Sequence, residues 1–308
     1  MAFTAADVKN LREMTGVGMM DCKKALTETD GDMDKAVEYL REKGLAKAAK
    51  KAGRIAAEGV SYALVENGVG ALVEVNCETD FCAKSAPFVA FVKDIAKVVA
   101  DNDPADVDAL MNCKYPGTEL TVSETMPEKV MSIGENLQIR RFVRFAENTS
   151  VGYVHAGGKI GVLVNLAVEG GVDATEIGKN VAMQIAALNP RFWDKSQVSQ
   201  DVLDEEKKIM MVQMENDPKM ASKPEAVREK IVMGKMNKFY EENCLLQMEF
   251  VRGDLFSGTV EQYIADAGKK LGGSVKFLTA VRYQTGEGIE KKEENFAAEV
   301  AAQMNQGK

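Results

Sequence analysis

The strongest constraint on the fold is an order of strand, hairpin turn, strand, helix and strand that the sequence repeats. In its first copy, apolar and polar residues alternate on both sides of Asn67-Gly68, a dipeptide that suits a tight hairpin turn because both residues tolerate a positive φ. A helical apolar period follows over 87–100, and a further strand pattern, LQIRRFVRFAE, occupies 137–147. This part of the chain therefore predicts a hairpin, a helix and a third strand.

The same order returns in the second half. The strand patterns VGYVHA and KIGVLVNLAV flank Gly157-Gly158, a helical pattern covers 175–188, and a last strand pattern covers 275–283. Two copies of one pattern predict an internally duplicated α+β core, although the two halves share little sequence. We expect one antiparallel three-stranded sheet in each half.

Helical patterns flank and interrupt this core. The first 55 residues carry apolar side chains at helical spacing with glycines between the periodic segments, which predicts three short helices and a connector after Gly44. Two charged helical segments joined around Asp217-Pro218 predict a helical hairpin inserted before the last strand. The expected units are 1–55 for the N-terminal helical module and connector, 56–147 for the core N-subdomain, 148–198 and 244–288 for the two parts of the core C-subdomain, 199–243 for the inserted hairpin, and 289–308 for a C-terminal module.

Helical spacing also predicts which side chains lie together on one face of each helix, because residues three, four or seven apart share a face. In the N-terminal module, Val8, Leu11 and Met14 are expected to share one helix face. Met20, Leu26 and the aliphatic part of Lys23 are expected to belong to a second helix, and Met33, Val37 and Leu40 to a third. In the hairpin, we expect Val202, Ile209 and Val212 to face Val227, Ile231, Met236 and Phe239. The proline-containing segment 101–129 is expected to be less regular.

Length, composition and charge limit the class of protein. A chain of 308 residues exceeds the ~100–200 residues of one typical domain, so several packed units are expected. With 45% hydrophobic and 28% charged residues and no apolar run near the roughly 18 residues of a membrane span, the sequence predicts a soluble protein without membrane contact. Its start carries Asp7 and no basic or long apolar segment, so we expect no secretory signal and a cytoplasmic location.

The net charge of −8 argues against direct nucleic-acid binding, and the basic stretch 47–54 is typical of a solvated helix end or linker.

Few residues could support catalysis or metal binding. The five cysteines are Cys22, Cys77, Cys82, Cys113 and Cys244. No two have the C-x-x-C spacing and His155 is the sole histidine, so the sequence predicts reduced thiols, no metal site and no cofactor. A histidine-assisted nucleophile would have only His155 as its base, and we interpret that residue as part of a turn before Gly157-Gly158.

The segment NCETDFCAK, residues 76–84, places a large aromatic side chain beside an acid on the connection that leaves the first hairpin. Exposing a phenylalanine side chain to water is unfavourable unless a partner covers it. The residues alone leave two interpretations of Phe81 open, packing in the core and anchoring an interface, because aromatic side chains serve both. Cys82 is interpreted as a small packed side chain.

Four segments together resemble the elongation factor Ts family. They are LREMTGVGMMDCKKAL at 11–26, NCETDFCAK at 76–84, HAGGKIGVLV at 155–164 and GEGIEKKEENFAAEVAA at 286–302. The four segments occur in the family's order and span nearly the whole chain. This resemblance implies an N-terminal module similar to ubiquitin-associated domains, a two-part core, a helical hairpin and a C-terminal module.

The resemblance also implies a partner, elongation factor Tu, and the residues that contact it. Asp80 and Phe81 match the pair that enters the GTPase near the magnesium of its nucleotide, with the phenylalanine as a wedge. The rest of that motif comprises Thr79, Cys82, Ala83 and Lys84. The other residues that match contact positions of the family are Arg12, Met19, Met20, His155, Gly157 and Phe296.

The sequence departs from the family's pattern at three places. Cys82 stands where the family usually has an aliphatic residue, so thiol reactivity stays open there. Asn295 stands where an acid is common, and residues 101–129 match no pattern of the family that assigns them contacts.

The resemblance implies a guanine-nucleotide exchange factor, not an enzyme: it would bind elongation factor Tu and release GDP by disturbing the phosphate and magnesium site. Two alternatives remain at this point, a scaffold that binds ubiquitin-like partners through residues 1–55 and a thiol enzyme that uses Cys82 or Cys77. Self-association through the helical hairpin is a further possibility.

Overall fold

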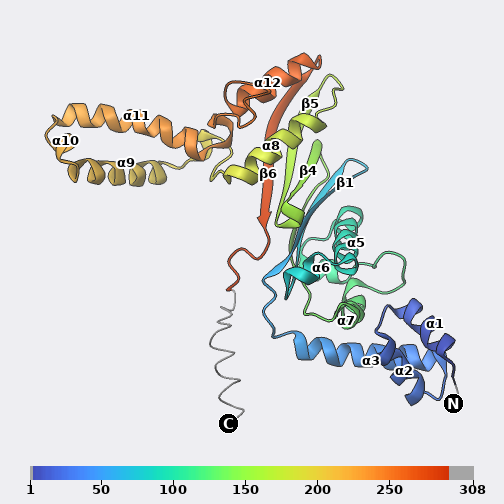
Figure 1. Cartoon of the computed structure of the whole chain (residues 1–308). Coiled ribbons are helices and arrows are strands. Elements are labelled where there is room, and N and C mark those ends of the chain that lie inside the picture. The colour runs from blue at the N-terminus through green and yellow to red at the C-terminus, as the bar shows by residue number, and fades with distance from the viewer. Residues whose placement is uncertain (1–2, 291–308) are drawn as a thin grey trace, which may run out of the picture.

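The computed structural model describes residues 3–290 and is a mixed helix and sheet protein with two antiparallel three-stranded sheets (Figure 1). The expected α+β fold class is confirmed. The expected C-terminal module falls almost wholly outside the described residues, and so does Phe296. Within residues 3–290, none of the helices is both long and apolar enough to cross a membrane.

Three helices form the N-terminal module: α1 (Ala5–Thr15), α2 (Met19–Glu28) and α3 (Met33–Lys51). Leu11, Leu26 and Leu40 meet in its small core, as the helical spacing predicts. Met14, which was expected to share a face with Val8 and Leu11, is 65% exposed, and Met20 of α2 is 75% exposed. Small side chains such as Cys22 and Ala25 complete this core and let the short helices pack closely together.

The expected break at Gly44 is absent, since α3 continues through it. Gly44 is buried against α7 (Val122–Ile133), where a Cβ atom would lie 3.3 Å from the carbonyl oxygen of Pro127. The glycine therefore permits a close helix contact and does not end the helix. An ion pair between Arg41 and Glu128, 3.1 Å apart, lies at the same contact.

The first sheet contains β1 (Glu58–Glu66), β2 (Val69–Cys77) and β3 (Gln138–Phe145), in that order. Asn67 and Gly68 have φ values of 51° and 82°, which confirms the predicted hairpin turn. Between β2 and β3 lie α4 (Asp80–Ala83), α5 (Ala86–Asn102), α6 (Val107–Met111) and α7. The expectation of an irregular segment over 101–129 was wrong in part, because capping side chains start α6 and α7 and the ring of Pro127 is accommodated inside α7.

The second sheet repeats this order with β4 (Thr149–His155), β5 (Ile160–Glu169) and β6 (Ser274–Gln284). A short 3-10 turn, η1 (Ala156–Gly158), joins β4 to β5, and α8 (Thr175–Leu188) follows β5 as predicted. A further helix, α12 (Val260–Lys270), precedes β6 and has no counterpart in the expected order.

The two sheets pack face to face, and helices cover their outer faces. On β2, Ala71, Val73 and Val75 pack with α5, whereas Leu72 points the other way and meets Leu163 of β5. This alternation is the period of two that a strand imposes. Glycines face the contact between the sheets: a Cβ atom on Gly152 would lie 2.9 Å from that of Ala63.

The inserted hairpin extends away from the sheets (Figure 1). It contains α9 (Gln200–Glu215), α10 (Pro218–Ala221) and α11 (Glu225–Asn243), between the short turns η2 (Lys195–Gln197) and η3 (Leu245–Gln247). The side chains between its helices include Val202, Met214, Ile231, Val232, Met236 and Phe239. The predicted inward positions of Ile209, Val212 and Val227 were wrong: all three are more than two-fifths exposed, because two helices in contact bury only a narrow stripe of each.

Candidate functional site

The most exposed large apolar side chain of the described residues, Phe81, lies on the short helix α4 directly after β2. Thr79 has an extended backbone and its hydroxyl accepts a hydrogen bond from the N–H of Cys82 at 3.1 Å, so it caps this helix. The turn buries Cys82 and Ala83 and leaves Phe81 86% exposed. Exposed apolar side chains on an ordered element are typical of contact sites.

Asp80 lies beside Phe81 on the same exposed face. Its carboxylate pairs with the ammonium group of Lys84 at 2.7 Å, one helical turn later. The hydrogen bond from Lys84 lowers the pKa of Asp80, with a smaller contribution from the positive charge of Lys159. The tertiary structure therefore places the 155–159 turn near α4, although the two segments are far apart in sequence.

A loop after α7 holds the turn from behind. Oε2 of Glu135 accepts hydrogen bonds from the N–H groups of Glu78 at 2.9 Å and Thr79 at 3.0 Å, and its Oε1 accepts one from the Thr79 hydroxyl at 2.6 Å. In return, Glu78 accepts a hydrogen bond from the N–H of Asn136 at 2.7 Å. Arg54 pairs with Glu78 at 3.3 Å, and Asn136 donates to the carbonyl oxygen of Arg54. These reciprocal bonds fix the direction in which α4 leaves the sheet.

Sequence analysis missed Glu135, Asn136 and Arg54, which support this turn. Their separation in the chain gives no local signal, because Glu135 and Thr79 are 56 positions apart. Only Gly134, with φ of 92°, marks the place as the end of a helix.

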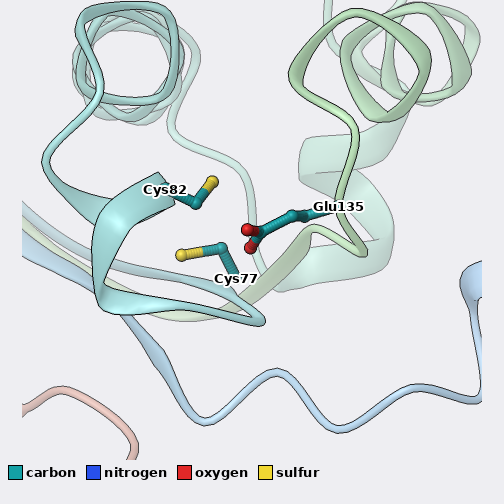
Figure 2. Close-up of side chains that lie close together, drawn as sticks. All are labelled: Cys77, Cys82 and Glu135. Atoms are coloured by element: carbon teal, nitrogen blue, oxygen red, sulfur yellow. The ribbon is translucent and has the colours of Figure 1, made fainter.

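Two cysteines and Glu135 lie behind the turn (Figure 2). Cys77 ends β2 with no exposed surface, and Cys82 is 7% exposed. The neighbouring Cys82 thiol, burial and the negative charge of Glu135 raise the pKa of Cys77. A nucleophilic cysteine needs a lowered pKa and access for a substrate, so this environment does not favour a thiol enzyme that uses Cys77.

The second core motif forms the turn that follows β4. His155 is exposed, and its Nδ1 lies 3.0 Å from the hydroxyl oxygen of Tyr153. Gly157 and Gly158 have φ values of 67° and 97°, and a Cβ atom on Gly158 would lie 2.7 Å from a methyl group of Val60. The glycines therefore let this turn approach the first sheet closely.

Residues 285 and 286, directly after β6, bind both the glycine turn after β4 and the first sheet. The hydroxyl of Thr285 donates to the carbonyl oxygen of Gly158 at 2.9 Å and lies 2.8 Å from the hydroxyl of Ser61. The N–H of Gly286 donates to Glu74 at 2.8 Å. The chain thus leaves the second sheet at the end of that sheet where η1 lies.

Glu74 of β2 is a buried carboxylate that binds both to arginines of β3 and to this segment. It is fully buried and pairs with Arg140 at 3.0 Å and Arg141 at 2.6 Å. Consecutive strand residues normally point to opposite faces, but a bulge between β2 and β3 at Glu74 and Val75 lets both arginines reach it.

The N-terminal residues Arg12, Met19 and Met20 are exposed on α1 and α2. The connection between these helices lies against α7, where a Cβ atom on Gly16 would be 3.9 Å from that of Ser132. The same end of α7 leads into Glu135. The structure therefore brings the N-terminal module to the loop that holds Thr79, while Met19 and Met20 themselves stay free of the core.

Comparison with known proteins shows which family of sequences this chain resembles. The family model described as "Elongation factor TS" matches residues 78–287. "Elongation factor Ts" of Clostridium botulinum (strain Eklund 17B / Type B) is 48% identical over 307 residues, which cover 98% of this chain and 99% of the relative. "Elongation factor Ts" of Clostridium novyi (strain NT) is 48% identical over 309 residues, with 98% and 99% covered.

Proposed function

The chain belongs to the elongation factor Ts family, and from that premise we propose that it is the guanine-nucleotide exchange factor of elongation factor Tu in the cytoplasm. Membership of the family makes it a translation elongation factor. In the proposed reaction it binds the GDP-bound GTPase, disturbs the phosphate and magnesium site, and so speeds the release of GDP. It makes and breaks no covalent bond.

The observation that carries this proposal is the exposure of Phe81 on a braced turn. A side chain that is 86% exposed gains free energy when a partner covers it, and a rigid turn loses little entropy on binding. Asp80 places a carboxylate beside the aromatic ring, where it can compete for groups that hold the nucleotide's magnesium.

Energetic coupling indicates that Phe81 does not act alone. Binding of the factor and of GDP must weaken each other by the same factor, and a thousandfold effect requires about 4 kcal/mol. Burial of one phenylalanine supplies about 1.5–3 kcal/mol. We therefore assign further contacts to Thr79 and Lys84 of the motif, to His155 and Gly157, to Arg12, Met19 and Met20, and to the C-terminal segment with Phe296. The buried motif residues Cys82 and Ala83 hold the turn from behind.

Release of a fluorescent GDP analogue from elongation factor Tu tests the proposal. We expect fast release with the intact chain and release about 10- to 100-fold less efficient with Phe81→Ala, which corresponds to the free energy of burying that side chain. Leu271→Ala is the matched control, because Leu271 is 52% exposed at the end of α12. Equal losses with both variants would remove Phe81 from the mechanism.

GDP release and alkylation of the cysteines together separate the alternatives. A scaffold that binds only through residues 1–55 would bind without changing GDP release. A thiol enzyme would lose activity on alkylation of its cysteines, whereas exchange depends on Phe81.

We also propose the outer face of α9 as the place to test for self-association. Ile209 and Val212 are 45% and 48% exposed there. Light scattering of Ile209→Glu beside the unchanged chain measures the effect, and an unchanged mass would count against a dimer formed by this face.

A further inference from the structure

Three potential metal ligands meet behind the exposed turn. The sulfur atoms of Cys77 and Cys82 and a carboxylate oxygen of Glu135 all lie within 4.8 Å of one another (Figure 2). They come from three elements: the end of β2, the helix α4 and the loop after α7. The spacing of the cysteines predicted no metal site, because the third ligand enters from a distant part of the chain.

We propose that Cys77, Cys82 and Glu135 form a binding site for a thiophilic divalent cation, with Zn²⁺ as the ion that fits best. Two thiolates and a carboxylate supply soft and anionic ligands that Zn²⁺ accepts in tetrahedral sites. Three protein ligands leave the fourth position for a water molecule. The half-buried carboxylate of Glu135 lies on the accessible side of the cluster, because both cysteines are buried.

The distances suit a small cation. With zinc–sulfur bonds of about 2.3 Å and zinc–oxygen bonds of about 2.0 Å, tetrahedral ligands lie about 3.5–3.8 Å apart. The present separations of up to 4.8 Å therefore require only small side-chain movements to close around the ion.

Glu135 retains one acceptor position for a cation. A carboxylate offers about four lone-pair positions, and Glu78 and Thr79 occupy three of them. These bonds also fix the orientation of the carboxylate, as outer partners of metal ligands commonly do. The Cys77 thiol donates its proton to the carbonyl oxygen of Thr79 at 3.2 Å, and metal binding would replace that proton.

The site would connect the turn to its support through a metal. Cys82 belongs to α4, and Glu135 belongs to the loop that holds Thr79, so one ion would join both across the base of the turn. Zinc would thereby restrict the helix that carries Phe81 without touching Phe81 itself.

Cobalt titration of the full chain tests the site directly. The reduced protein is treated with a chelator, its free thiols are counted, and Co²⁺ is then added as a spectroscopic substitute for Zn²⁺. We expect one equivalent of Co²⁺ to give a sulfur-to-cobalt charge-transfer absorption that Zn²⁺ then abolishes. Cys82→Val should abolish this absorption, and Glu135→Gln should weaken Co²⁺ binding at least about tenfold.

Cys113→Ser is the control, because Cys113 is a free cysteine outside the cluster. Circular dichroism confirms that each variant is folded. Three results would overturn the proposal: no charge-transfer absorption in protein with all thiols reduced, absorption that survives Cys82→Val, or a disulfide between Cys77 and Cys82 that persists under reducing conditions. No GTPase is present in this assay, so its failure would leave the proposed exchange activity untouched.

Discussion

Glu135 accepts two hydrogen bonds from Thr79, one from its N–H at 3.0 Å and one from its hydroxyl at 2.6 Å. Thr79 in turn caps the helix that exposes Phe81. The loop that follows α7 therefore sets the direction of the exposed turn, although it lies 56 positions further along the chain. Rigid support of this kind reduces the entropy that a contact loop loses on binding.

Removal of this support should weaken the turn more than the fold. In Glu135→Ala, three donors lose their acceptor, and water reaches two of them, so we expect a loss of about 1 kcal/mol in the free energy of unfolding. GDP release should slow towards the level of Phe81→Ala. Denaturant unfolding and the GDP-release assay measure the two effects, with the exposed Glu147→Ala as control. Unchanged exchange in Glu135→Ala would show that the turn needs no brace.

The buried carboxylate of Glu74 should matter far more for stability. Glu74→Gln leaves two positively charged arginines beside a neutral side chain, and we expect a loss of about 3 kcal/mol in the free energy of unfolding. Glu66→Gln removes a surface pair with Lys97 and should cost less than about 1 kcal/mol. Urea unfolding of both variants makes the comparison, and similar losses would contradict the role given to burial.

Contact between the sheets should depend on glycine at position 152. A methyl group in Gly152→Ala would lie 2.9 Å from Cβ of Ala63, so we expect a loss of about 1–3 kcal/mol. Ala63→Gly removes the opposing methyl group and should restore part of that loss in the double variant. Thermal unfolding of the two single variants and the double variant measures the coupling. Simple addition of the two single losses would show that the methyl groups do not meet.

Acid should weaken the start of α7 through Glu124. The backbone N–H of Thr121 hydrogen bonds to this carboxylate and lowers its pKa. Its contribution to stability is therefore present above the ordinary glutamate pKa of the unfolded chain, about 4.3, and is lost in the acid interval below it, as the pH falls through the lowered folded pKa. Glu124→Gln keeps an acceptor but does not titrate, so stability should fall less over this interval. Unfolding curves at several pH values test this, and parallel loss in both proteins would assign the acid sensitivity elsewhere.

Local patterns in the sequence were enough to predict much of the core. The positive φ values of Asn67 and Gly68, the helix over Thr175–Leu188 and the repeat of two three-stranded sheets follow from residue preferences and apolar period. The resemblance that pointed to the family also rests on short contiguous segments. These features depend on neighbours in the chain, which a sequence displays directly.

Tertiary contacts decided the rest. Helical spacing placed Ile209 and Val212 between the helices of the hairpin, but both are exposed, because two helices in contact cover only a narrow stripe of each. The residues alone left Phe81 between core and interface, and only the tertiary structure shows that α4 buries Cys82 and Ala83 while it leaves Phe81 86% exposed. Glu135 became the support of the site only when folding brought it across 56 positions to Thr79. Amino-acid order determined the elements and the family, whereas exposure and long-range hydrogen bonds arose from packing, which depends on all elements at once.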